Sequence, residues 1–137
     1  MVTLLKIDYI IFQSLKTINM SQQLKDRTKA FSIRVIKMVK GIRWNQVDDI
    51  LIKQVVRSAT SVGANYRSAL ARSKADFISK ITVAEEEADE TCYWLEIMIE
   101  IEVFPGKRME PLLKEAQELT AILTSAGKTA KEKQVRK

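Results

Sequence analysis

Two glutamates, Glu87 and Glu90, lie three residues apart and are the first candidates for a catalytic or metal-binding pair. Residues three apart lie on the same side of a helix, so this pair could act as general acid and base or supply oxygen ligands to a hard cation. No nucleophile, phosphate-binding loop or substrate-shaped pattern accompanies the pair, and carboxylates at this spacing are common on any acidic helix. The sequence therefore predicts no catalytic residue, no metal ligand and no cofactor-binding residue.

The composition narrows the remaining chemistry, because the 137 residues include no histidine and a single cysteine, Cys92. A chain without histidine cannot build Ser-His or Cys-His nucleophile pairs, His-ligated zinc or a di-iron site based on Glu-x-x-His. One cysteine cannot form an internal disulfide, which is typical of proteins from a reducing compartment such as the cytoplasm. We therefore predict a protein that is not an enzyme.

The segment that carries the two glutamates has a second apolar face when it is drawn as a helix. At 100° per residue, that face consists of Val83, Trp94, Ile97 and Ile101. Glu87 and Glu90 project from within it, so they would be partly desolvated and would need hydrogen-bond partners or a cation. We predict an interhelical polar cluster of Arg27, Asn65, Glu87 and Glu90. The alternative is that both glutamates flank the core and reach water.

An apolar arc of this width is more than one side of a simple bundle helix requires. The helix is therefore either central in the fold or also lines a contact between subunits. In the second case, the oligomer interface would include Trp94, Ile97 and Ile101.

The chain contains four amphipathic segments, of which this helix is the third. It has only 4 glycines and 2 prolines in all. The first begins near Ser21 and ends at Gly41, and the second begins near Gln46. Ser73 and Asp76 resemble a capping box that opens the third, which extends to about residue 103. The fourth covers about residues 107–125, with Gly127 as its C-cap. This pattern predicts an all-α fold, an antiparallel up-down four-helix bundle.

Two segments flank the predicted bundle domain at residues 21–127. Residues 1–20 form an N-terminal extension that is too short and too charged for a membrane span and lacks the pattern of a secretory signal. This extension is either a functional arm or the product of an upstream start codon, because Met20 precedes the predicted first helix. Residues 128–137 carry five basic residues against one acidic residue and should fray as a basic tail.

The net charge of +6 hides two blocks of opposite sign. Residues 21–45 contain seven basic residues and one acidic residue, whereas residues 74–102 contain nine acidic residues and two lysines. The two blocks could be solvated faces, or they could meet within the chain or between subunits. A third reading is a phosphate-binding surface, for which the candidate nucleic-acid contacts are Lys25, Lys29, Lys40 and Arg43.

Several short motifs resemble those of the four-helix bundle family known as 23S rRNA intervening-sequence proteins. They are Arg27-Thr28 with Phe31, Val62-Gly63-Ala64-Asn65-Tyr66, Asp76-Phe77-Ile78-Ser79-Lys80 and, most specifically, Glu87-Ala88-x-Glu90-Thr91-x-Tyr93-Trp94-Leu95. The resemblance implies a bacterial cytoplasmic protein that forms a ring-like homo-oligomer, a pentamer in relatives, with no accepted catalytic activity. It also implies a likeness in fold to the accessory protein of diversity-generating retroelements, a basic pentamer that engages a reverse transcriptase and nucleic acid.

The residues and the resemblance together predict a non-enzymatic oligomeric bundle that binds structured RNA or a nucleic-acid enzyme through its basic surface. A ring would repeat one basic patch several times, so weak phosphate contacts would gain avidity. The alternative is a protein-binding scaffold without a nucleic-acid role, in which the two charge blocks neutralise each other across a subunit contact.

Overall fold

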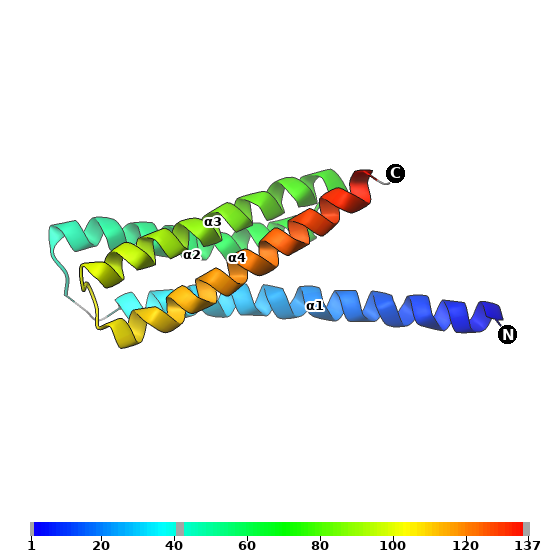
Figure 1. Cartoon of the computed structure of the whole chain (residues 1–137), viewed down its shortest axis with the longest axis horizontal. Coiled ribbons are helices and arrows are strands. Elements are labelled where there is room, and N and C mark those ends of the chain that lie inside the picture. The colour runs from blue at the N-terminus through cyan, green and yellow to red at the C-terminus, as the bar shows by residue number, and fades with distance from the viewer. Residues whose placement is uncertain (1, 41–42, 136–137) are drawn as a thin grey trace.

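The computed structural model describes residues 2–40 and 43–135, which form four helices and no strand. The helices are α1 (Val2–Val39), α2 (Gln46–Leu70), α3 (Lys74–Glu100) and α4 (Gly106–Val135). Successive helices run in opposite directions, so the two termini lie toward the same end of the molecule (Figure 1). The all-α four-helix prediction is confirmed.

The local sequence explains where the middle helices begin. The Asn45 side chain accepts a hydrogen bond of 2.8 Å from the Asp48 amide and caps α2. The Ser73 hydroxyl accepts from the Asp76 amide and contacts the Asp76 carboxylate at 2.9 Å, so the predicted capping box opens α3. Such caps satisfy amides that have no partner within the helix.

The end of α3 differs slightly from the prediction, because the helix stops at Glu100 and not near residue 103. Glu102 has a φ of 58°, the left-handed conformation that glycine normally supplies at a helix end. The amide of Val103 donates to the Met98 carbonyl and that of Glu102 to the Ile99 carbonyl, which is the Schellman pattern. The helix therefore stops before Pro105-Gly106.

Two predicted helix boundaries are wrong. α1 begins at Val2 and passes through Ser21 without a break, since no glycine or proline interrupts residues 2–40. α4 continues through Gly127 to Val135, so the described part of the basic tail is helical and not frayed. Gly127 is buried, and a Cβ there would lie 3.4 Å from Ile81 Cγ2, so the glycine permits close packing and does not cap the helix. Gly41, Ile42, Arg136 and Lys137 lie outside the described residues.

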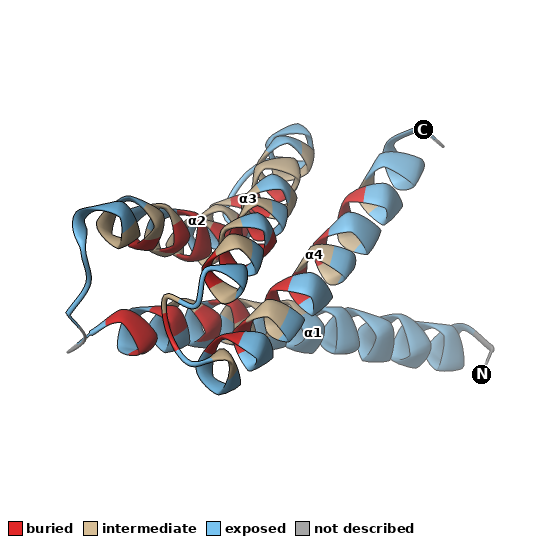
Figure 2. Ribbon diagram, turned by 60° about the vertical axis from the view of Figure 1, so that its left-hand side comes forward, coloured by how far each residue is buried: buried red, intermediate tan, exposed pale blue. Residues whose placement is uncertain are grey.

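The core runs along the inside of the bundle and includes the stripes that the apolar periodicity predicts (Figure 2). One cluster, around Phe31, Val55 and Leu95, includes Val39 and Ile52 on either side of the turn between α1 and α2. A smaller cluster, around Tyr66, Ile81 and Leu123, lies toward the turn between α2 and α3. Cys92 is buried and has no disulfide partner.

The four helices are not evenly packed. α2 and α3 contact each other along their lengths, whereas α1 and α4 diverge toward the two termini (Figures 1 and 2). The first half of α1 therefore projects beyond the bundle. No helix within residues 2–40 and 43–135 is long and apolar enough to cross a membrane.

Candidate functional site

The two glutamates singled out by their spacing are joined to α2 by one arginine. Arg57 Nη1 lies 3.1 Å from Glu87 Oε2, and Arg57 Nη2 donates to Glu90 Oε1. Trp94 Nε1 donates to the same Glu90 oxygen at 3.0 Å. The side chains of Glu87, Glu90 and Arg57 are 18%, 35% and 46% exposed, so this seam lies at the edge of the core.

The electrostatics of this seam favour a structural role. The hydrogen bond from Trp94, followed by that from Arg57, lowers the pKa of Glu90, because both stabilise the carboxylate. The carboxylates in turn raise the pKa of Arg57, with the Glu90 hydrogen bond as the largest cause. A general acid needs the opposite shift, a carboxyl group that keeps its proton at neutral pH. The arrangement therefore holds α2 against α3 as a set of fixed charges.

The predicted cluster of Arg27, Asn65, Glu87 and Glu90 is wrong in its membership. Arg27 pairs with Glu115 and Glu118 on α4, and these bonds, led by that to Glu115, raise its pKa. Asn65 donates to the Ser61 carbonyl at 2.8 Å within its own helix. The physical reason is topology: α1 packs on α2 and α4, and within the described residues its backbone makes no close approach to α3.

A simple rule would have found Arg57. In an antiparallel helix pair, residues at equal distances from the connecting turn face each other. Arg57 and Glu87 are equally far in sequence from Arg72, which lies in the turn between α2 and α3. Register around the turn thus identifies the partner that residue type alone leaves open.

Beneath the Arg57 seam lies a buried polar contact. Thr91 Oγ1 on α3 is 2.9 Å from Ser58 Oγ on α2 and 2.7 Å from the Glu87 carbonyl oxygen. Both hydroxyl residues are completely buried. Within the described ranges, every buried side-chain nitrogen or oxygen has a hydrogen-bond partner, and no group of three acidic, cysteine or histidine side chains is arranged to hold a metal.

The four predicted nucleic-acid contacts lie at the surface. Lys29, Lys40 and Arg43 are exposed and Lys25 is half-buried, and none of these side chains forms an ion pair among the described residues. At 100° per residue, the three lysines share an arc of about 60° on α1. The acidic outer face of α3 lies diagonally across the bundle from α1, so the described parts of the two charge blocks do not face each other within one copy.

The residues predicted for an oligomer interface are only partly available. Trp94 is half-buried against the main core, bonds to Glu90 and makes an edge-to-face contact with Tyr93, at 5.2 Å between ring centroids. Ile97 is also half-buried, whereas Ile101 is 51% exposed at the end of α3. Trp94 thus has a packing role inside the chain.

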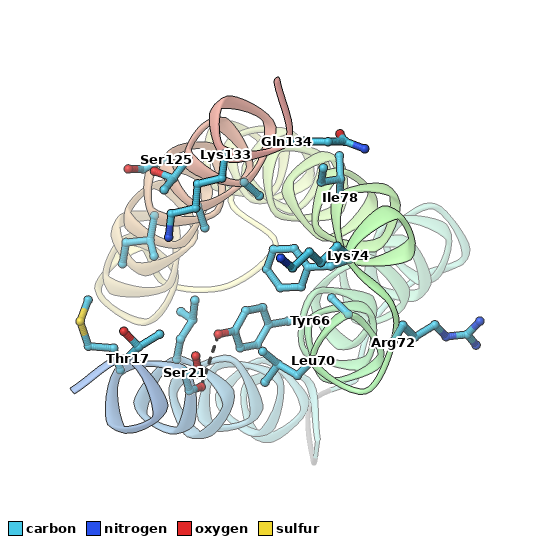
Figure 3. A pocket seen from close by; sticks show the side chains of 18 of the residues that line it. Thr17, Ser21, Tyr66, Leu70, Arg72, Lys74, Ile78, Ser125, Lys133 and Gln134 are labelled. Atoms are coloured by element: carbon cyan, nitrogen blue, oxygen red, sulfur yellow. Dashed lines mark hydrogen bonds between the residues drawn. The ribbon is translucent and has the colours of Figure 1, made fainter. Parts of the chain in front are cut away.

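An apolar groove that the sequence did not reveal lies between α1, α4 and the turn between α2 and α3 (Figure 3). It has a volume of about 900 Å³. Most of its walls are apolar, from Met20, Leu24, Phe77, Ile78, Ile122 and Ala126. Tyr66 closes one wall and donates from its hydroxyl to the Ser21 carbonyl at 3.4 Å, while its burial raises its pKa. The groove depends on the angle between α1 and α4, which no residue pattern encodes.

Comparison with known proteins places this geometry in a family. The family model described as 23S rRNA-intervening sequence protein matches residues 20–125. A solved structure from Bacteroides thetaiotaomicron, described as a protein of unknown function from the S23 ribosomal protein family, is 36% identical. It superposes with a TM-score of 0.72 over 79% of this chain and 97% of its own. Among curated proteins, no sequence matches the chain significantly. The chain belongs to the 23S rRNA-intervening sequence protein family.

Proposed function

We propose that this protein is a non-enzymatic bundle that assembles with copies of itself and binds structured RNA through the outer face of α1. The observation that carries the proposal is a set of cations on and just after that helix that form no ion pair with any residue of 2–40 and 43–135: Lys25, Lys29, Lys40 and Arg43. A lysine without an internal partner keeps its whole charge for phosphate.

Three other basic residues of the bundle are held by carboxylates and are less free to meet phosphate. Arg27 and Arg57 are bound by carboxylates at the two seams, and Lys53 pairs with Asp49 at 2.8 Å. Lys25, Lys29 and Lys40 share one side of a rigid helix, so they could contact a phosphate backbone without reading base sequence. Several copies would multiply these weak contacts into useful avidity.

The absence of an enzymatic role is part of the proposal. The paired carboxylates at the α2–α3 seam are both held by Arg57, and the Glu90 pKa shift runs against acid catalysis. The Cys92 thiol is buried, and burial is the largest of the effects that raise its pKa, which disfavours the reactive thiolate.

The experiment is an electrophoretic mobility shift with a structured RNA at low salt. Wild-type protein should shift the RNA, and the double variant Lys29→Gln/Lys40→Gln should shift it only at a several-fold higher concentration. Lys53→Gln is the matched control, because it removes a lysine from α2 and leaves the α1 face intact. Absence of any shift by the wild-type protein at low salt would overturn the proposal.

A second candidate function is a protein scaffold, and the acidic face of α3 favours it. Its exposed acidic residues are Glu86, Asp89, Glu96 and Glu100. If the α1 face of one copy meets the α3 face of the next, the contact is head-to-tail, the kind that forms a ring when the rotation between copies closes. Dissociation of the assembly by salt, without RNA binding by either form, would select this function over the first.

A further inference from the structure

The first half of α1 exposes an apolar surface for which this copy provides no cover. Ten large apolar side chains between Leu4 and Met20 are each 48–69% exposed. These ten side chains follow one another along a single helix, whereas a monomeric protein rarely exposes contiguous apolar patches larger than a few hundred Å². We call residues 2–20 the apolar arm, and all but the last of them lie outside the family match at 20–125.

The arm has the pattern of a helix that packs on other helices. Its main seam contains Leu4, Ile7, Ile11, Leu15 and Ile18, at steps of three and four residues. Tyr9, Ile10 and Phe12 add apolar surface on its other sides. A helix lying on a membrane surface needs one strongly polar face rich in lysine and arginine, but the arm has only Lys6, Lys16 and Asp8 as charges. Its wide apolar arc suits a groove that surrounds it.

The apolar groove between α1 and α4 is lined mostly by apolar side chains, which suits the apolar surface of the arm. Its wall on α4 runs from Ala121 to Gln134, about 20 Å at 1.5 Å per residue, and the arm is about 28 Å long. The arm cannot enter the groove of its own chain, because α1 continues as one helix through the groove residues Thr17 and Leu24. Only the arm of another copy can reach it.

We propose that the apolar groove of one copy receives the apolar arm of a second copy, and that the exchange is reciprocal. The arm leaves directly from the wall of its own groove, at Thr17 and Met20. Two copies with antiparallel α1 helices would therefore each place an arm in the other's groove, which is a two-fold contact. Ten large apolar side chains, each 48–69% exposed, are available for burial in this contact, and a standard stable interface buries roughly 800 Å² per partner.

The contact is tested directly by cross-linking between two differently marked full chains. One carries Leu4→Cys in the arm and the other Ala126→Cys in the groove, and the mixture is treated with a short thiol cross-linker. Leu4 lies about 24 Å along the helix from Met20, so it cannot reach the groove of its own chain. The native Cys92 is buried and should not react. We expect a covalent heterodimer with this pair. The pair Leu4→Cys and Val47→Cys is the control, because Val47 lies in the first turn of α2, outside the groove.

A second measurement uses the mass of the assembly. Ile11→Glu with Leu15→Glu should lower the mass at a given concentration, while the melting temperature of the single copy should not fall, because both side chains are exposed. Val47→Glu with Ile50→Glu makes the same change on exposed residues of α2 and should leave the mass unchanged.

The outcomes separate this inference from the proposed function, on whose self-association it rests. If the wild-type protein binds no RNA but the Leu4–Ala126 cross-link forms, only the proposed function is contradicted. No cross-link, or an unchanged mass in the arm variant, overturns the inference even if RNA is bound. Arm-dependent binding to vesicles of phosphatidylcholine and phosphatidylglycerol, without the cross-link, would overturn it in favour of a membrane surface.

Discussion

Gly63 on α2 lies directly against Thr28 on α1: a Cβ at Gly63 would be 3.3 Å from Thr28 Oγ1 and 3.4 Å from the Thr28 carbonyl carbon. Thr28 is completely buried, so it has little freedom to move aside. A glycine within a helix costs about 1 kcal/mol against alanine, and this close approach of α1 to α2 accounts for the glycine here.

Gly63→Val should therefore destabilise the bundle by about 1–3 kcal/mol, because the added methyl groups force α1 and α2 apart. The measurement is urea unfolding followed by circular dichroism. Ala64→Val is the control, since Ala64 is exposed on the same helix and valine has the same helix propensity there. A Gly63→Val variant no less stable than wild type would contradict the contact with Thr28, because on propensity alone valine is better than glycine and worse than alanine in a helix.

Arg57→Ala should lower the free energy of unfolding by about 1 kcal/mol, because it leaves the mostly buried Glu87 carboxylate without its cation. Lys53→Ala also removes a cation from α2, but its partner Asp49 is on the surface, so we expect a smaller loss. Chemical denaturation at low salt measures both. A loss for Arg57→Ala no greater than that for Lys53→Ala would contradict the structural role of the Arg57 seam.

The contribution of Glu90 should depend on pH in a defined direction. Its pKa is lowered in the folded state, so the unfolded state binds the proton more tightly and stability rises with pH. The stabilisation is complete above the unfolded pKa of about 4.3 and is lost as the pH falls through the lower folded value. Wild type should thus melt above Glu90→Gln at neutral pH, and the difference should shrink in acid. A difference in melting temperature between wild type and Glu90→Gln that grows as the pH falls would contradict the lowered pKa of Glu90.

Periodicity predicts much of this fold because it is a local property. Phe31, Val35 and Met38 recur at steps of four and three residues and are buried. Ser73 caps α3, as its position three residues before Asp76 predicts. The role of Gly127 is not local: a glycine can cap a helix or let two helices approach, and only the neighbouring Ile81 decides which.

The candidate site was harder to predict for a related reason. The need of Glu87 and Glu90 for a cation follows from their position on an apolar face, but the choice between Arg27 and Arg57 depends on which helices are neighbours. The groove was missed because it arises from the divergence of α1 and α4, not from any residue that lines it.

Cys92 should resist thiol reagents in the native protein. It is buried, its Sγ lies 3.9 Å from Thr120 Oγ1, and desolvation raises its pKa. Its reaction with Ellman's reagent should be at least tenfold slower than in denatured protein, because a buried thiol reacts only on opening. A native rate close to the denatured rate would contradict the packing of α3 on α4.

The role of the α1 face is tested most directly by the salt dependence of RNA binding, measured by fluorescence anisotropy of a labelled RNA. Affinity should fall steeply with salt, and the log–log slope should be smaller by about 2 for Lys29→Gln/Lys40→Gln than for wild type, since each lost phosphate contact lowers it by about 1. Lys53→Gln should keep the wild-type slope. The same slope in the wild type and the double variant would show that RNA, if bound, does not contact this face.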